Sequence, residues 1–134
     1  MSFTLERQLI ETAYQAGMPV GSAIEFQNDR FVPTGNSYTR LSVMSGGEGR
    51  RVEVTATAHE RVPGVIDVAI FVRNETGEAL VRTIADQVTA ALAYRTLQSG
   101  TTTLRTYGGR LDIIGESGDW FQGNVTIRFE RDST

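Results

Sequence analysis

The chain has 134 residues, a formal net charge of -3 and no cysteine. Its hydrophobic share of 40% and charged share of 22% are those of a globular protein with one core, so we expect a single domain over residues 1–134. The acidic balance argues against binding of nucleic acid through its phosphates, and the missing cysteine excludes disulfides and thiol chemistry. No apolar run reaches the roughly 18 residues of a membrane span, and no signal-peptide pattern is present, which predicts no membrane partner and a cytoplasmic location.

The first predicted element is an amphipathic helix over about residues 3–16. Its apolar side chains recur at helical spacing and form one face: Leu5, Leu9, Ile10, Ala13 and Tyr14. Gly17 and Pro19 then end the helix. Glu6 is the one charge inside the apolar face. We interpret it as a first-turn carboxylate favoured by the helix dipole, with an ion pair to another subunit as the alternative.

Three strands are predicted in the next part of the chain, after a short segment at 23–26. They cover residues 38–44, 52–59 and 65–73, which are rich in β-branched and aromatic residues. The third is apolar on both faces apart from Asp67, so we expect it at the centre of the sheet. A charge on a central strand needs a partner, and an arginine is the partner that we expect for Asp67.

The stretch VMSGGEGRRVEVT, residues 43–55, joins the first two of these strands. It contains three glycines followed by two arginines: Gly46, Gly47, Gly49, Arg50 and Arg51. A phosphate-binding loop of the Walker type needs a lysine and a following helix, whereas here the lysine is missing and a strand follows. The glycines instead predict a hairpin turn over 45–51, because glycine adopts positive φ at little cost. The two arginines at its foot are either solvated or in contact with a neighbouring subunit.

A second amphipathic helix is predicted over about residues 77–95. The segment 97–107, which contains Arg105 and Tyr107, has no periodicity and is predicted to be a mobile loop. Strands at 110–114 and 120–130 then close the chain as a hairpin. Because each helix has one apolar face, both should lie on one side of the sheet. The predicted fold is therefore α+β, a mostly antiparallel mixed sheet with two helices on one face, in the order α-β-β-β-β-α-β-β.

No arrangement of side chains typical of catalysis is evident in the sequence. His59 is the only histidine, and it falls on the polar face of its predicted strand without a cysteine or serine partner. With one histidine and no cysteine, we predict neither a metal site nor a cofactor. A small hydrolase or ligand-binding domain built around Asp67, Asp112 and His59 is the alternative of a different class.

Several short motifs occur in the order found in one family of virion proteins. They are NDRFVPTGNSYTRLSV from residue 28, SGGEGRR from 45, GVIDVAIFV from 64, TGEALVRTIADQV from 76 and GDWFQGNVTIRF from 118. Over nearly its whole length the chain resembles the tail terminator family of long-tailed bacteriophages.

The resemblance implies a structural protein that is not an enzyme and uses no cofactor. Such proteins form a ring, typically a hexamer, that caps the tail tube, stops its polymerisation and offers a surface to the head connector or neck protein. DNA passes through the hole without sequence-specific binding. The implied location is the virion tail, and the host cytoplasm during assembly. A head completion or neck connector protein is the alternative within the same structural class.

Within a ring, we expect certain residues at the contact between subunits. They are Glu6, Gly46, Gly47, Gly49, Arg50, Arg51, Asp67, Arg105 and Tyr107. The hairpin at 45–51 and the loop at 97–107 are expected to be ordered by these contacts.

Overall fold

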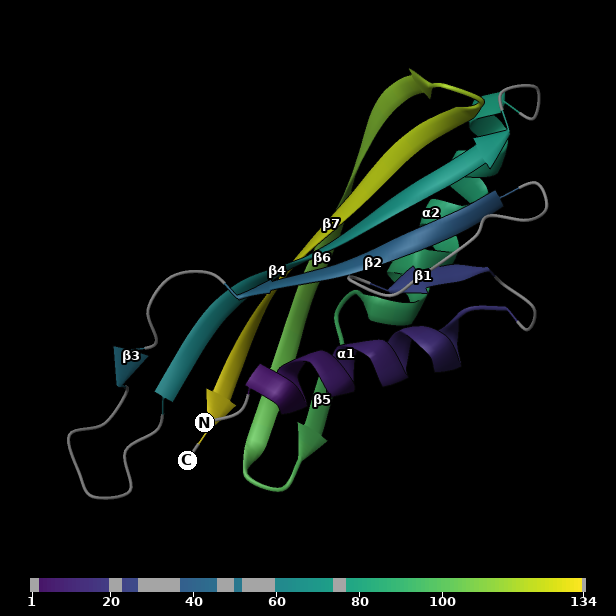
Figure 1. Ribbon diagram of the computed structural model, residues 1–134. Coiled ribbons are helices and arrows are strands. Elements are labelled where there is room, and N and C mark those ends of the chain that lie inside the picture. The colour runs from purple at the N-terminus through teal and green to yellow at the C-terminus, as the bar shows by residue number, and fades with distance from the viewer. Residues whose placement is uncertain are drawn as a thin grey trace.

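A computed structural model describes residues 3–19, 23–26, 37–45, 50–51, 60–73 and 77–133. The elements in chain order are α1 (Phe3–Gly17), β1 (Ile24–Phe26), β2 (Ser37–Ser45), β3 (Arg50–Arg51), β4 (Glu60–Arg73), α2 (Gly77–Leu92), β5 (Thr96–Ser99), β6 (Thr102–Ser117) and β7 (Trp120–Ser133). The fold is α+β, with a mixed and mostly antiparallel sheet and both helices on one side of it, as predicted (Figure 1). Neither described helix is long and apolar enough to cross a bilayer.

The strands follow the order β1-β2-β4-β7-β6-β5 across the sheet. Among the strands that the structure describes, only β1 and β2 are parallel, and the other neighbours are antiparallel. Val68 in β4 lies between Leu41 of β2 and Val125 of β7. The prediction that the strand around Asp67 is central is therefore confirmed.

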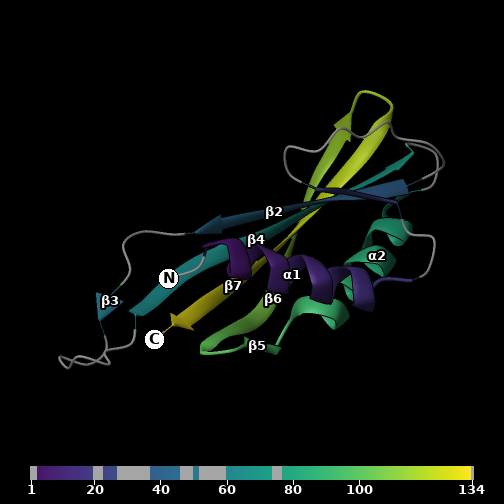
Figure 2. The same ribbon diagram turned by 60° about the horizontal axis from the view of Figure 1, so that its bottom comes forward.

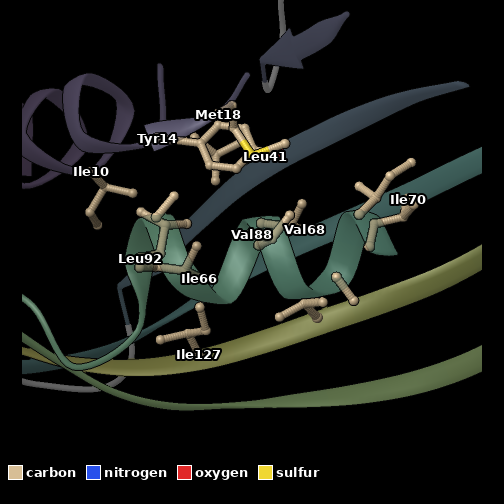
Figure 3. Close-up of a cluster of buried hydrophobic side chains, with 14 of the residues drawn as sticks. Ile10, Tyr14, Met18, Leu41, Ile66, Val68, Ile70, Val88, Leu92 and Ile127 are labelled. Atoms are coloured by element: carbon tan, nitrogen blue, oxygen red, sulfur yellow. The ribbon is translucent and has the colours of Figure 1, made fainter. Parts of the chain in front are cut away.

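The hydrophobic core lies between the helices and the face of the sheet that they cover (Figure 3). Alternate residues of β4 point into it, and Ile66, Val68 and Ile70 are all fully buried. They meet apolar side chains of both helices and of β2 and β7, among them Ile10, Tyr14, Met18, Leu41, Val88, Leu92 and Ile127. Each fully buried aliphatic side chain of this kind contributes about 1.5–3 kcal/mol of transfer free energy.

The two helices touch at the carboxyl end of α1 (Figure 2). A Cβ atom added at Gly17 would lie 2.5 Å from the Cβ of Ala91, which is closer than two such atoms approach in proteins. Gly17 therefore lets the helices meet there, in addition to ending α1. The sequence predicted the ending but not the contact.

Residues 97–107 are not the mobile loop that the sequence predicts. They belong to a hairpin of β5 and β6, and β6 begins at Thr102, eight residues before the predicted start at 110. Leu97 and Leu104 pair across it and face the core, and on β6 the buried Thr102 and Thr106 flank Leu104 on the same face. Because threonine is polar but β-branched, it favours a strand without producing a visible hydrophobic alternation.

The second helix ends at Leu92, three residues before the predicted end. Tyr94 adopts a φ of +54°, which a helix cannot continue through. Thr106 of β6 donates a hydrogen bond from its Oγ1 to the carbonyl of Leu92. A side chain from a distant strand thus satisfies a carbonyl at the helix end, and this contact could not be read from the local sequence.

The segments on either side of residues 46–49 do not form the hairpin that the sequence predicts over 45–51. Ser45 pairs with Gly64 and Arg50 pairs with Arg61, and both pairings are antiparallel. The two segments that flank the glycines therefore run in the same direction along one edge of β4, and they are not antiparallel partners of each other. Gly46, Gly47 and Gly49, as well as the predicted strand 52–59 with His59, lie outside the described residues.

Candidate interaction surface

Both helices pack on one side of the sheet, and no other element of the described ranges covers the opposite side, which we call the open face. Near the ends of β4 and β7 it carries a small aromatic cluster of Tyr38, Phe71 and Trp120. The rings of Tyr38 and Phe71 stack with centroids 4.6 Å apart, and Trp120 meets Tyr38 edge-on at 5.0 Å. The guanidinium of Arg73 lies 3.9 Å from the Trp120 ring centroid. At this end of the open face, the aromatic and arginine side chains thus pack on one another.

The opposite end of the open face contains a hollow of about 620 Å³. The open-face hollow is lined by Pro63, Gly64, Val65, Tyr107, Arg128, Phe129 and Glu130. Tyr107 is 44% exposed, and Met44, the neighbour of Val65 in the pairing of β2 with β4, is 49% exposed. The open-face hollow therefore combines an accessible apolar floor with charged side chains.

Gly64 shapes the floor of the open-face hollow. It is paired with Phe129 across β4 and β7, and a Cβ atom added at Gly64 would lie 2.2 Å from Cζ of the Phe129 ring. The ring thus occupies the space that a side chain would take. We infer that larger residues at this position would displace Phe129 from the core.

A network of charges borders the open-face hollow. The Nε of Arg61 lies 2.8 Å from Oδ1 of Asp132 and 3.8 Å from Oε2 of Glu130. The Nη1 of Arg105 lies 3.6 Å from Oδ2 of the same Asp132. Exposed pairs of this kind contribute about 0–1 kcal/mol to stability each. They can therefore exchange partners when another protein approaches, at little cost to the fold.

Tyr107 connects the charged border with the apolar floor. Its partial burial raises the pKa of the phenol, and the Glu130 carboxylate, to which the hydroxyl donates a hydrogen bond, raises it further. The positive charges of Arg105 and Arg61 act in the opposite direction. Tyr107 is therefore a neutral hydrogen-bond donor at physiological pH, with an apolar ring beside Val65.

Asp67 lies on the same open face, but its partner is not the arginine that the sequence predicts. Its carboxylate is hydrogen-bonded to Thr126, the residue opposite it on β7. Burial raises the pKa of this carboxyl group. Among the described residues no arginine makes an ion pair with Asp67, because β7 presents a threonine at that position.

Asp67 and Asp112 do not form a catalytic pair. They lie on β4 and β6, two strands apart and two residues out of register, which places their Cα atoms roughly 12 Å from each other. Asp112 is engaged by its neighbour Arg110, with Nη2 and Oδ1 3.2 Å apart. In the ranges that the structure describes, no group of three or more histidine, cysteine, aspartate or glutamate residues is placed to hold a metal ion.

Glu6 lies on the other side of the sheet, under α1. It is buried, and its Oε2 accepts a hydrogen bond of 2.8 Å from Nε of Arg131, which is fully buried as well. Ser45 donates a second hydrogen bond to Oε1. Glu6 lies in the first turn of α1, as we interpreted it. Its ion pair is inside the chain, between the first helix and the last strand, and this differs from the alternative of a pair with another subunit.

Three of the predicted interface residues therefore lie on the same open face, Asp67, Arg105 and Tyr107, and of these Tyr107 lines the open-face hollow. Arg50 and Arg51 lie at the edge of β4, opposite Arg61 and Glu60. Arg61, Glu130 and Asp132 were not among the residues predicted to lie at an interface. The signal for the last two was available, because Arg128, Glu130 and Asp132 alternate with buried residues along β7.

Comparisons with known proteins give a fold and no family. No protein-family model matches the chain, and no curated protein matches it significantly. One solved structure that carries no functional description matches with a TM-score of 0.69 and 21% sequence identity. The match covers 100% of this chain and 96% of the other. At this identity the likeness supports the fold and says nothing about activity.

Proposed function

We propose that this chain is a structural tail terminator, which forms a ring on the end of a phage tail tube, stops its polymerisation and offers a surface for head joining. The order of sequence motifs supports this proposal, as described above. In this view the ring is typically a hexamer through which DNA passes, and the chain acts by binding proteins without transforming a substrate. Its place is the virion tail, after assembly in the host cytoplasm.

The open-face hollow is the observation that carries the proposal. It has an apolar floor around Val65 and Tyr107, and a border of arginines and carboxylates that pair weakly with one another. Protein interfaces have the same organisation, with an apolar centre inside a polar rim and with tyrosine and arginine enriched. We assign the open-face hollow to a contact with another protein of the tail. Arg50 and Arg51, on β3 at the edge of β4, remain predicted contacts with a neighbouring subunit.

The proposal is tested with purified chain and isolated tail tubes. We expect rings that cap tube ends and stop elongation, visible by negative-stain electron microscopy and measurable as tube length. The double variant Arg105→Glu with Tyr107→Asp should weaken capping tenfold or more, with little change in thermal stability because both side chains are exposed.

The matched control is Arg82→Glu, which reverses the charge of an exposed arginine on α2, away from the open face. It should cap tubes like the unchanged chain. A chain that stays monomeric at high concentration and never caps a tube would refute the proposal. Binding to heads that carry a portal, in place of tubes, would instead identify a neck connector protein.

A further inference from the structure

The tip of the β6–β7 hairpin presents two isoleucines to solvent. Ile113 is 38% exposed and Ile114 is 56% exposed. The pairing of β6 with β7 shifts between Ile113 and Gly115, so that Ile114 has no partner in register, and Gly115 adopts a φ of +105°. A β-bulge of this kind turns a side chain out of the regular alternation. The bulge thus holds an aliphatic pair on the surface.

A groove lies at the other end of the molecule, between α1 and β5. Its α1 wall consists of Leu5, Gln8, Leu9, Thr12, Ala13 and Ala16, and its other wall is formed by residues 95–99. The groove has a volume of about 490 Å³, within the range of roughly 300–1,000 Å³ that is typical of cavities holding small ligands. It can therefore accept two aliphatic side chains.

The hairpin tip and the groove cannot meet within one chain. Leu104 on β6 pairs with Leu97 beside the groove, and ten residues of the same strand separate Leu104 from Ile114. An extended strand of that length spans roughly 33 Å. Figure 2 shows the hairpin tip and β5 at opposite ends of the sheet. Two complementary surfaces at opposite ends produce a head-to-tail contact, which closes into a ring or continues as a filament.

The charges of the two surfaces are complementary. The tip carries exposed carboxylates at Glu116 and Asp119 beside the isoleucines. The only ionisable side chain among the described residues that line the groove is Arg95, which is exposed. An acidic, aliphatic tip is thus suited to a groove that offers aliphatic side chains, among them Leu5, Leu9 and Leu97, beside neutral polar ones and one arginine.

We propose that the tip of one copy, with Ile113 and Ile114, binds the α1–β5 groove of the next copy. This inference deepens the proposed function and rests on it, because it names the two surfaces through which subunits of the ring meet. It leaves the open-face hollow available for the tail tube.

Disruption at each surface is the first test. Ile114→Asp places a charge on the tip, and Ala16→Asp places one in the groove. Because both residues are exposed, the fold should persist. Each variant should need at least tenfold more protein to associate, as measured by sedimentation velocity. The controls are Ile114→Val, which keeps an aliphatic side chain, and Gln15→Asp, which places the same charge next to the groove on α1. Both controls should associate like the unchanged chain.

Cross-linking is the second test, and the cysteine-free chain makes it specific. A chain with Ile114→Cys and Ala16→Cys should form disulfides only between copies, because a disulfide needs Cα atoms within about 7 Å. We expect a ladder of oligomers that ends at the ring. The pair Ile114→Cys with Thr83→Cys, which places the second thiol on the exposed side of α2, should give no ladder.

The outcomes separate the two proposals. If the unchanged chain associates, but the Asp variants associate equally and no ladder forms, the tip and groove are not the contact, while the proposed function stands. If the unchanged chain stays monomeric at millimolar concentration and on tube ends, both proposals fail.

Discussion

The two faces of the sheet differ in how deeply they bury arginine–carboxylate pairs. On the covered face, Arg131 is fully buried and paired with the buried Glu6. On the open face, Arg61 pairs with Asp132 at nearly the same distance, yet 36% of its side chain remains exposed. The ion pair under α1 is part of the folded core, whereas the pair on the open face stays accessible to a partner. The distance between nitrogen and oxygen alone therefore does not determine how much an ion pair contributes to stability.

The largest expected effect is on the covered face. Glu6→Ala should lower the free energy of unfolding by about 3–5 kcal/mol, because it leaves the Arg131 charge buried without its carboxylate. The matched change Asp132→Ala on the open face should cost at most about 1 kcal/mol. Urea denaturation measures both. Equal losses of unfolding free energy would contradict the difference between the two faces. Recovery of stability in the double variant Glu6→Leu with Arg131→Met would confirm that the unpaired charge of Arg131 causes the loss.

A pair of tyrosines gives the next comparison. Tyr14 is buried and its hydroxyl lies 2.6 Å from Oγ1 of Thr39. Tyr14→Phe should cost about 1–3 kcal/mol because the Thr39 hydroxyl loses a buried partner. Tyr107→Phe on the open face should cost less than about 0.5 kcal/mol. Thermal unfolding of both variants checks this, and a larger loss for Tyr107→Phe would contradict it.

The same tyrosine predicts a pH dependence. Burial raises the pKa of Tyr14 to about 12, from an ordinary value of 10.0. The folded chain therefore keeps a proton that the unfolded chain loses, so the stability contributed by Tyr14 falls as the pH rises from about 10 to about 12. Denaturation at several alkaline pH values should show a steeper loss for the unchanged chain than for Tyr14→Phe. Parallel curves would exclude this role.

The smallest expected effect is at Asp67. Because burial raises the pKa of its carboxyl group, the ionised form costs stability, and this cost is present above the folded-state pKa. Asp67→Asn, which can still bond to Thr126, should slightly raise the thermal midpoint at pH 7. The gain should shrink as the pH falls through the raised folded-state pKa, and it should be absent below the ordinary aspartate pKa. A lower midpoint at pH 7 would mean that the carboxylate stabilises the open face.

The parts of the fold that were predictable are those with strong periodicity. The apolar arcs of α1 and α2, the continuous apolar run of β4 and the alternation in β7 appear directly in the residue order. We did not predict β5 or the threonine-rich first part of β6, because their apolar positions are few and their pairing depends on Leu97 meeting Leu104.

The candidate site was less predictable than the fold. Asp67, Arg105 and Tyr107 were identified, but the face that unites them follows from strand order, which the local sequence does not contain. The partnership of Glu6 with Arg131 joins residues 125 positions apart. It depends on how the end of β7 lies under α1, and helix periodicity could only identify Glu6 as a charge among apolar residues.

Oxidation of methionine tests the central claim most directly. Met44 is exposed beside the open-face hollow, whereas Met18 is buried in the core, so the chain contains both a probe and an internal reference. Under dilute peroxide, mass spectrometry should find Met44 oxidised in the free chain and protected once the chain is bound to tail tubes, with Met18 protected in both states. Equal oxidation of Met44 in free and tube-bound chain would contradict the assignment of the open face to assembly.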